Sequence, residues 1–134
     1  MIRKTRLKNI TNSKGNIIKL IRKDSKNFSN FGELYISKIN YGKVKGWKKH
    51  TNMKMNIFVI SGKVQFVFFF EKQKKFQKIT VSDYKTGLYI PNNIWFAFKG
   101  LSRSKENLVM NFANIMHKDN ESLKKNLNFF KYKW

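Results

Sequence analysis

The sequence predicts an all-β domain, either a sandwich or a barrel. Roughly eight or nine short segments rich in β-branched and aromatic residues follow one another, with turn residues about every 8–12 positions, which is typical of such folds. Hydrophobic residues make up 41% and aromatic residues 16% of the chain, enough to build a core. With 134 residues, a single proline and no Gly/Ser-rich linker, we expect one domain over residues 1–134.

The first elements are predicted from turns and alternation. We expect residues 1–9 to be a loosely held arm or a strand that pairs with a neighbouring chain. A turn at residues 13–16 precedes a short apolar strand at 17–21. Residues 33–40 alternate between two faces and contain β-formers throughout, so they form the next strand.

The middle of the chain predicts a hairpin. Residues 53–60 and 64–70 are both β-rich, and Ser61-Gly62-Lys63 between them is a tight turn, so we expect the two strands to pair. The consecutive aromatic residues Phe68 to Phe70 interrupt the alternation and make both faces of the second strand apolar. One face then belongs to the core, and the other to a contact with a second sheet or subunit.

The second half of the chain continues the pattern. Asp119 is a suitable N-cap for a short helix over residues 122–126, and the aromatic residues 129–134 are expected to pack onto the domain or across a dimer. The remaining predicted strands are residues 76–81, 88–91, 94–99 and 107–115.

Composition excludes several classes of protein. The absence of cysteine excludes disulfides, thiolate metal sites and a cysteine nucleophile, and it fits a cytoplasmic location. The most apolar run, residues 57–70, is interrupted by polar residues and is shorter than the ~20 residues of a membrane span. The basic N-terminus is not followed by the apolar stretch of a secretory signal, so we expect no membrane association.

The net charge of +22 leaves two interpretations. Such a charge attracts nucleic acid or phosphorylated ligands. However, the basic residues are nearly all lysines, they are spread along the chain, and asparagine, isoleucine and phenylalanine are also abundant. We therefore favour compositional bias over nucleic-acid binding, which stays the alternative: a non-enzymatic basic β-barrel that binds nucleic acid or another polyanion.

Five segments carry a family resemblance. They are FGELYISKINYGKVKGWKKH, MNIFVISGKVQFVFF, LYIPNNIWFAFKG, ANIMHKDNE and the terminal KYKW. In this order and spacing they resemble the cupin-fold nucleotide-sugar epimerases and isomerases, in particular short relatives of the dTDP-4-dehydrorhamnose 3,5-epimerases. The resemblance implies a jelly-roll (double-stranded β-helix) barrel, a homodimer and a role in the synthesis of surface-polysaccharide sugars.

The resemblance also implies a reaction without cofactor or metal. A nucleoside-diphosphate 4-keto-6-deoxy sugar loses a proton beside its ketone, and the resulting enolate is reprotonated. The family's base is a histidine that corresponds to Lys48, so Lys48 and the nearby His50 are the catalytic candidates. Lys48 is a base only if burial or a neighbouring cation, such as Lys45 or Lys49, lowers its pKa; otherwise it is a charged residue at the pocket mouth.

Other positions follow or depart from the family pattern. Lys45 stands where the family has a cation for the ligand's carbonyl or phosphates. Met55 stands where the family has a lysine in the next strand, and Phe66 stands where it has an aspartate that orients the base, so the catalytic site is altered. Of the four positions that bind metal in other cupins only His50 keeps a ligand, with Phe96 at the last one, which predicts a barrel without metal.

Further pocket candidates come from polar and aromatic residues in the predicted strands, with core packing as the alternative for each. His117 and the residues after it, in the segment HKDNE, are interpreted as a helix entry and not as part of the site. The pocket candidates are Tyr35, Asn56, Tyr89, Trp95 and Asn111.

Overall fold

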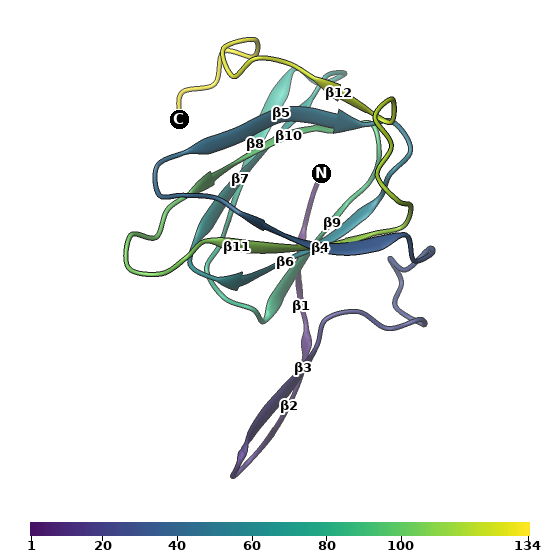
Figure 1. Cartoon of the computed structure of the whole chain (residues 1–134), viewed down its shortest axis with the longest axis vertical. Coiled ribbons are helices and arrows are strands. Elements are labelled where there is room, and N and C mark those ends of the chain that lie inside the picture. Colours follow the sequence, from purple (N-terminus) through teal and green to yellow (C-terminus); the bar gives the residue numbers. More distant parts are fainter.

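The computed structural model describes residues 1–134 and confirms the all-β fold (Figure 1). Two five-stranded antiparallel sheets face each other, and a two-stranded hairpin projects from them. In spatial order, the β6 sheet contains β1 (Lys4–Arg6), β9 (Thr86–Ile90), β6 (Met55–Ser61), β11 (Leu108–Ala113) and β4 (Glu33–Lys38). The β7 sheet contains β12 (Ser122–Lys124), β5 (Val44–His50), β10 (Trp95–Gly100), β7 (Val64–Phe70) and β8 (Lys75–Val81).

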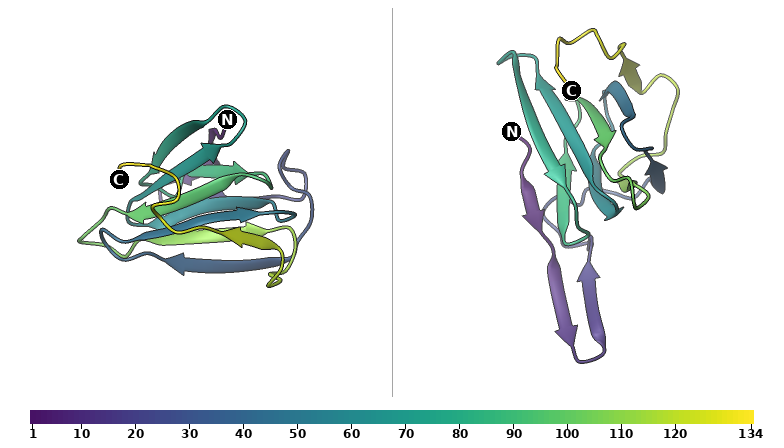
Figure 2. Two further views of the ribbon diagram at one scale, coloured as in Figure 1. Left: turned by 90° about the horizontal axis from the view of Figure 1, so that it is seen from above. Right: turned by 90° about the vertical axis from the view of Figure 1, so that its left-hand side faces the viewer.

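The body of the domain holds part of the N-terminal arm, and a hairpin projects beyond it. Residues 1–9 are not loose as a whole, because Ile2 is buried and β1 pairs with β9. The segment that leaves the body is instead β2 (Lys8–Asn12) with β3 (Gly15–Lys19), seen from the side in Figure 2. No helix of the structure has the length and apolar character needed to cross a bilayer.

The turn at Ser61-Gly62-Lys63 is present, but the predicted pairing across it is wrong. β6 pairs with β9 and β11, whereas β7 pairs with β8 and β10. The turn therefore carries the chain from one sheet to the other. Both strands have a fully apolar inner face, and stacking them as opposite layers buries these faces against each other.

The core fills the space between the sheets. Met55, Ile57 and Val59 of β6 contact the inner residues of β7, and Phe66 and Phe68 are completely buried there. Phe66 is thus a core residue, which explains why an apolar side chain at this position is compatible with the fold.

A second apolar cluster lies on the outer face of the β7 sheet. Its buried centre is Trp47, Val67, Trp95 and Ala97, and the C-terminal segment covers it with Phe130, Tyr132 and Trp134. The rings of Phe69 and Phe130 have centroids 4.4 Å apart. The second face of the Phe68–Phe70 run, at the half-buried Phe69, packs against the chain's own C-terminal segment and not against the second sheet or subunit that the sequence predicted.

The predicted helix over residues 122–126 is wrong. Ser122–Lys124 form strand β12, which pairs with β5 from His50 to Lys48. Without β12, β5 would be an edge strand with unpaired backbone groups. Satisfying these groups outweighs the local helical signal.

Candidate functional site

A cavity of about 210 Å³ opens between the two sheets, and five of the predicted site residues line it: Tyr35, Lys45, Lys48, His50 and Asn111. Tyr35 enters from β4, because strand alternation turns its neighbours Leu34 and Ile36 outwards, each 53% exposed. Lys45, Lys48 and His50 enter from β5. The full lining is Tyr35, Ser37, Lys45, Gly46, Lys48, His50, Met55, Phe96, Phe98 and Asn111.

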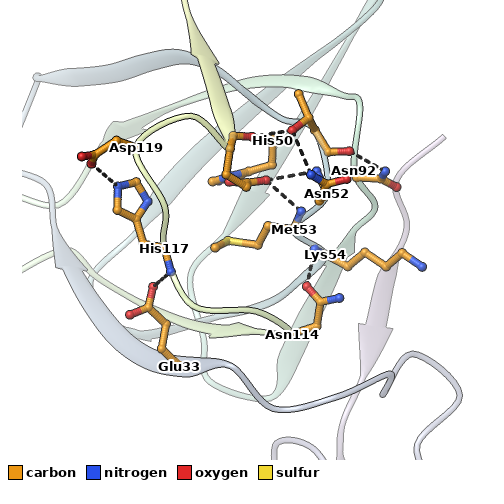
Figure 3. Close-up of polar contacts among 11 residues, drawn as sticks. Glu33, His50, Asn52, Met53, Lys54, Asn92, Asn114, His117 and Asp119 are labelled. Atoms are coloured by element: carbon orange, nitrogen blue, oxygen red, sulfur yellow. Dashed lines mark hydrogen bonds and ion pairs between the residues drawn. The ribbon is translucent and has the colours of Figure 1, made fainter.

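His50 forms a buried pair with Glu121. Its Nδ1 lies 2.6 Å from Glu121 Oε2, and the two side chains are 4% and 2% exposed. The other carboxylate oxygen accepts hydrogen bonds from the backbone N–H groups of Met53 at 2.8 Å and Asn52 at 3.1 Å. Figure 3 shows these contacts converging beside His50. The imidazole also stacks on Phe96, with centroids 6.0 Å apart, so its plane is fixed.

The backbone around His50 is held as firmly as its ring. The Asn93 N–H donates to the His50 carbonyl at 2.7 Å, and the Asn92 side chain donates to the Thr51 carbonyl at 2.8 Å. Thr51 in turn donates its N–H and its hydroxyl to the Glu121 carbonyl. The turn after Pro91 and the start of β12 therefore fix the end of β5 from both sides.

The carboxylate determines which nitrogen of His50 is available. An ionised carboxylate only accepts hydrogen bonds, so the hydrogen at this contact belongs to Nδ1. Nε2 then carries the free lone pair of the neutral ring, and it is neither hydrogen-bonded nor sealed from solvent. His50 lines the cavity, and Nε2 is the ring nitrogen that remains free to act as a base.

Ionisation supports this arrangement. Burial lowers the pKa of His50 below its ordinary value, against the opposing effect of Glu121, so the ring is neutral at pH 7. Burial acts to raise the pKa of Glu121, but the hydrogen bonds from Met53, His50 and Asn52 outweigh it and hold this pKa below its ordinary value. A neutral histidine beside an ionised carboxylate is suited to general-base chemistry.

Lys48 is half-buried next to His50. Burial, and then the charge of Lys124, lower the pKa of its ammonium group. The sequence predicted Lys45 or Lys49 as the cation responsible, but Lys49 points to the opposite face of the sheet, where it pairs with Glu71 at 2.9 Å. The neighbour that counts is Lys124, which β12 places opposite Lys48.

Tyr35 and Asn111 face each other across strands β4 and β11. Burial, followed by the charges of Glu33 and Glu121, raises the pKa of Tyr35, so its hydroxyl keeps its proton at neutral pH. Asn111 donates its amide to the Val109 carbonyl at 3.1 Å. Lys45 donates to the Lys38 carbonyl at 2.6 Å and adds a cation to the lining.

Three predicted pocket residues lie elsewhere. Asn56 and Tyr89 are cross-strand partners on the outer face of the β6 sheet, where both line a surface hollow under residues 19–27. Trp95 belongs to the outer aromatic cluster, and its Nε1 donates to Glu71 at 3.1 Å. Strand alternation explains all three, since their side chains point away from the core face.

Glu121 was missed by the sequence analysis. The segment HKDNE was interpreted as a helix entry, whereas its last residue completes the pair with His50. One signal was available: only 7 residues of the chain are acidic, so each carboxylate is a candidate for a specific contact with a basic group. His117, in the same segment, is an exposed residue 3.7 Å from Asp119. No three His, Asp, Glu or Cys side chains are grouped as metal ligands.

Comparison with known proteins shows the fold family. A dTDP sugar isomerase from Desulfovibrio desulfuricans G20 superimposes with a TM-score of 0.87 and 27% identity, over 99% of this chain and 90% of that one. QdtA, a sugar 3,4-ketoisomerase from Thermoanaerobacterium thermosaccharolyticum solved with TDP, superimposes with a TM-score of 0.80 and 15% identity, over 96% of this chain and 90% of that one. ChmJ, a 3′-monoepimerase from Streptomyces bikiniensis solved with dTDP-quinovose, superimposes with a TM-score of 0.79 and 9% identity, over 94% of this chain and 70% of that one.

These superpositions confirm the cupin-like jelly-roll fold. No curated protein sequence is significantly similar to the chain. The family model described as "WxcM-like, C-terminal" (FdtA) matches residues 2–134. With this match over nearly its whole length, the chain belongs to the FdtA, WxcM-like C-terminal family.

Proposed function

We propose that the protein binds a nucleoside-diphosphate 4-keto-6-deoxy sugar and catalyses proton transfer at the carbon next to the ketone. The observation that carries this proposal is His50, held by Glu121 with a basic nitrogen in the cavity. The related structures support the ligand class, since QdtA was solved with TDP and, as a histidine variant, with TDP-4-keto-6-deoxyglucose.

His50 Nε2 is the base in this proposal. It accepts the proton from C3, the C–H electron pair forms the C3–C4 double bond, and the carbonyl electrons move to the C4 oxygen. Lys48 and Lys45 supply positive charge for the resulting enolate. Of the two roles left open for Lys48, this proposal takes the charged residue and not the base, because a base must first lose its proton and His50 is already neutral.

The enolate can give two different products. Return of a proton to C3 from the opposite face inverts that centre, which is the epimerase outcome predicted from the family resemblance. Transfer of the C3 hydroxyl proton to the C4 oxygen, with protonation of C4, gives the 3-keto isomer instead. Tyr35, on the wall opposite β5, is the candidate proton donor, because its hydroxyl stays protonated.

Solvent exchange tests the proposal. The protein is incubated with dTDP-4-keto-6-deoxyglucose in D₂O, and the product is examined by proton NMR. Deuterium at C3 with inversion identifies an epimerase, and deuterium at C4 identifies a ketoisomerase. His50→Asn should abolish the exchange, whereas His117→Asn, at the exposed histidine, should leave it unchanged. Binding without any exchange would reduce the protein to a nucleotide-sugar binder, and the absence of both would overturn the proposal.

We also propose that two copies of the chain associate. The outer face of the β6 sheet exposes Leu34 and Ile36, and the projecting hairpin exposes Ile10 at 41% and Ile17 at 60%. A second copy would cover these apolar residues and the open edges of the hairpin. Light scattering should give twice the chain mass of 16.0 kDa, and Ile17→Lys should shift the protein towards the monomer. A monomer at micromolar concentration would contradict this.

A further inference from the structure

The C-terminal segment, residues 125–134, is joined to the partner of His50 through one short strand. It follows β12 directly, and Glu121 comes immediately before β12. Figure 1 shows the segment, in yellow, continuing from β12 beside β5. Its aromatic residues cover the outer face of the β7 sheet, on the side away from the cavity. The position of Glu121 therefore depends on what holds β12 in place.

β12 buries little surface of its own. It is three residues long, Leu123 is 48% exposed, and Lys124 is also exposed. Residues 117–120, on the N-terminal side of Glu121, are exposed as well. A backbone hydrogen bond in water does little more than offset the conformational entropy of the residue that it orders, so a short edge strand without buried side chains is marginally stable. β12 therefore depends on an anchor outside itself.

Trp47 is the residue of β5 to which the C-terminal segment is attached. It lies three residues before His50, and its side chain is 1% exposed on the outer face of the sheet. Its backbone N–H donates to the Lys125 carbonyl at 3.1 Å, and its carbonyl accepts from the Lys125 N–H at 3.0 Å. The indole Nε1 donates to the Leu127 carbonyl at 3.1 Å. These three hydrogen bonds fix the start of the segment to β5.

Phe130 supplies the apolar contact that β12 lacks. The centroid of its ring lies 4.4 Å from that of Phe69, 5.3 Å from that of Trp47 and 5.4 Å from that of Trp95. Buried aromatic pairs of this kind stabilise a contact through both their apolar area and their ring geometry. None of the three partners lines the cavity, so any effect of Phe130 on His50 passes through the backbone of β12 and β5.

We propose that the C-terminal segment is a positioning element of the site, in which Trp47 and Phe130 hold Glu121 against His50. The inference rests on the proposed function, because it concerns the same base. When the segment is docked, Glu121 Oε2 accepts from Nδ1 and leaves Nε2 free. When it detaches, β12 leaves the edge of β5, and the imidazole loses the acceptor that keeps its hydrogen on Nδ1. Docking on one face of the sheet thus sets the tautomer on the other.

Phe130→Ala and a matched control test the inference. The control is Phe28→Ala, which truncates another half-buried phenylalanine; its ring packs 6.0 Å from that of Phe112 on the outer face of the β6 sheet. Both variants are made in the His117→Asn background, because the chain has two histidines and this change leaves His50 as the one ring observed. The tautomer is then measured by nitrogen-15 NMR without substrate.

The wild-type chain and Phe28→Ala should both show the Nδ1–H form of His50. Phe130→Ala should show a mixture of the two tautomers, together with faster solvent exchange of the Trp47 indole hydrogen, which the Leu127 carbonyl no longer protects. Deuterium exchange into the substrate should fall by about tenfold or more in Phe130→Ala, as part of the roughly 10²–10⁴-fold that a general base contributes.

Two outcomes would overturn the inference. The first is a folded Phe130→Ala that keeps the Nδ1–H form and exchanges deuterium within about threefold of the wild type. The second is an equal change in Phe28→Ala, because the tautomer would then follow general stability. If Phe130→Ala does not fold, Phe130→Leu decides in its place, with a smaller change in the same direction expected and an unchanged tautomer counting against the inference.

The result is separable from the proposed function, because the tautomer is measured without substrate. If Phe130→Ala changes the tautomer but the wild type exchanges no deuterium, the positioning role stands and the catalytic proposal fails. If the wild type exchanges deuterium and Phe130→Ala keeps both its tautomer and its exchange rate, only the positioning role is wrong.

Discussion

Glu121→Gln is the substitution that most directly tests how the site works. The variant keeps the size of the side chain and one oxygen, which can still accept from the backbone of Met53 and Asn52. It replaces the oxygen facing His50 Nδ1 with an amide that donates. The imidazole must then accept at Nδ1, which moves its hydrogen to Nε2 and removes the basic nitrogen from the cavity.

The expected magnitudes separate activity from stability. General-base catalysis contributes roughly 10²–10⁴-fold, so Glu121→Gln should lower kcat by about that factor. The number of hydrogen bonds is conserved, so we expect a stability loss of only about 1 kcal/mol. Glu121→Ala instead leaves three donors without an acceptor at a buried site and should cost about 3–6 kcal/mol, a large part of a typical domain's stability.

The assay combines deuterium exchange from solvent with urea denaturation. Nitrogen-15 NMR of the histidine ring adds a direct reading of the tautomer, which should change from Nδ1–H in the wild type to Nε2–H in Glu121→Gln. Folded Glu121→Gln with exchange within threefold of the wild type would refute the reasoning. So would an unchanged tautomer, because the predicted loss of activity depends on it.

Three further predictions concern stability. Gly46→Ala should destabilise the fold by about 2–4 kcal/mol, because Gly46 has φ +139° and an added Cβ would lie 2.4 Å from that of Ala97; thermal unfolding checks this, and an unchanged melting temperature would contradict it. Folding lowers the pKa of His50, so the contribution of this residue to stability is complete above about pH 6.5 and is lost as the pH falls through its folded pKa. Urea unfolding between about pH 7.5 and 5 should therefore show a decline in the free energy of unfolding, and this decline should be smaller in His50→Gln. Phe130→Ala should lower the free energy of unfolding by about 2–4 kcal/mol and expose the outer cluster around Trp47 and Phe69. Unfolding experiments and the binding of a hydrophobic dye measure these two effects. A loss below about 1 kcal/mol would mean that the C-terminal segment covers this face only loosely.

Local patterns predicted most of the strands and failed where distant segments compete. The turn at Ser61-Gly62-Lys63 was recognised, but whether its strands pair or stack depends on which other strands are present. The helix predicted over residues 122–126 rests on local propensity, and the open edge of β5 overrides it. In both cases the deciding partner lies far away in the sequence.

The site shows the same division. The two-residue spacing of Lys48 and His50 and the alternation around Tyr35 are properties of the sequence, and these three residues do meet in the cavity. Lys45, three residues before Lys48, joins them through the register shift between β5 and β10. Asn56, Tyr89 and Trp95 have suitable chemistry, but their inward or outward direction depends on which face of each sheet becomes the core. Only the tertiary structure reveals this, and here it turns all three away.

The sequence by itself determined an all-β chain with a basic, histidine-containing segment from Lys45 to His50, because strand periodicity and residue chemistry are local properties. The tertiary structure decided the surroundings of His50 and Lys48. It brings Glu121 to the first and Lys124 to the second by adding β12 to β5, across about 70 residues of chain. Glu121 fixes the tautomer of His50, and Lys124 adds to the effect of burial in lowering the pKa of Lys48, because the charge state of a side chain is set by its neighbours in space.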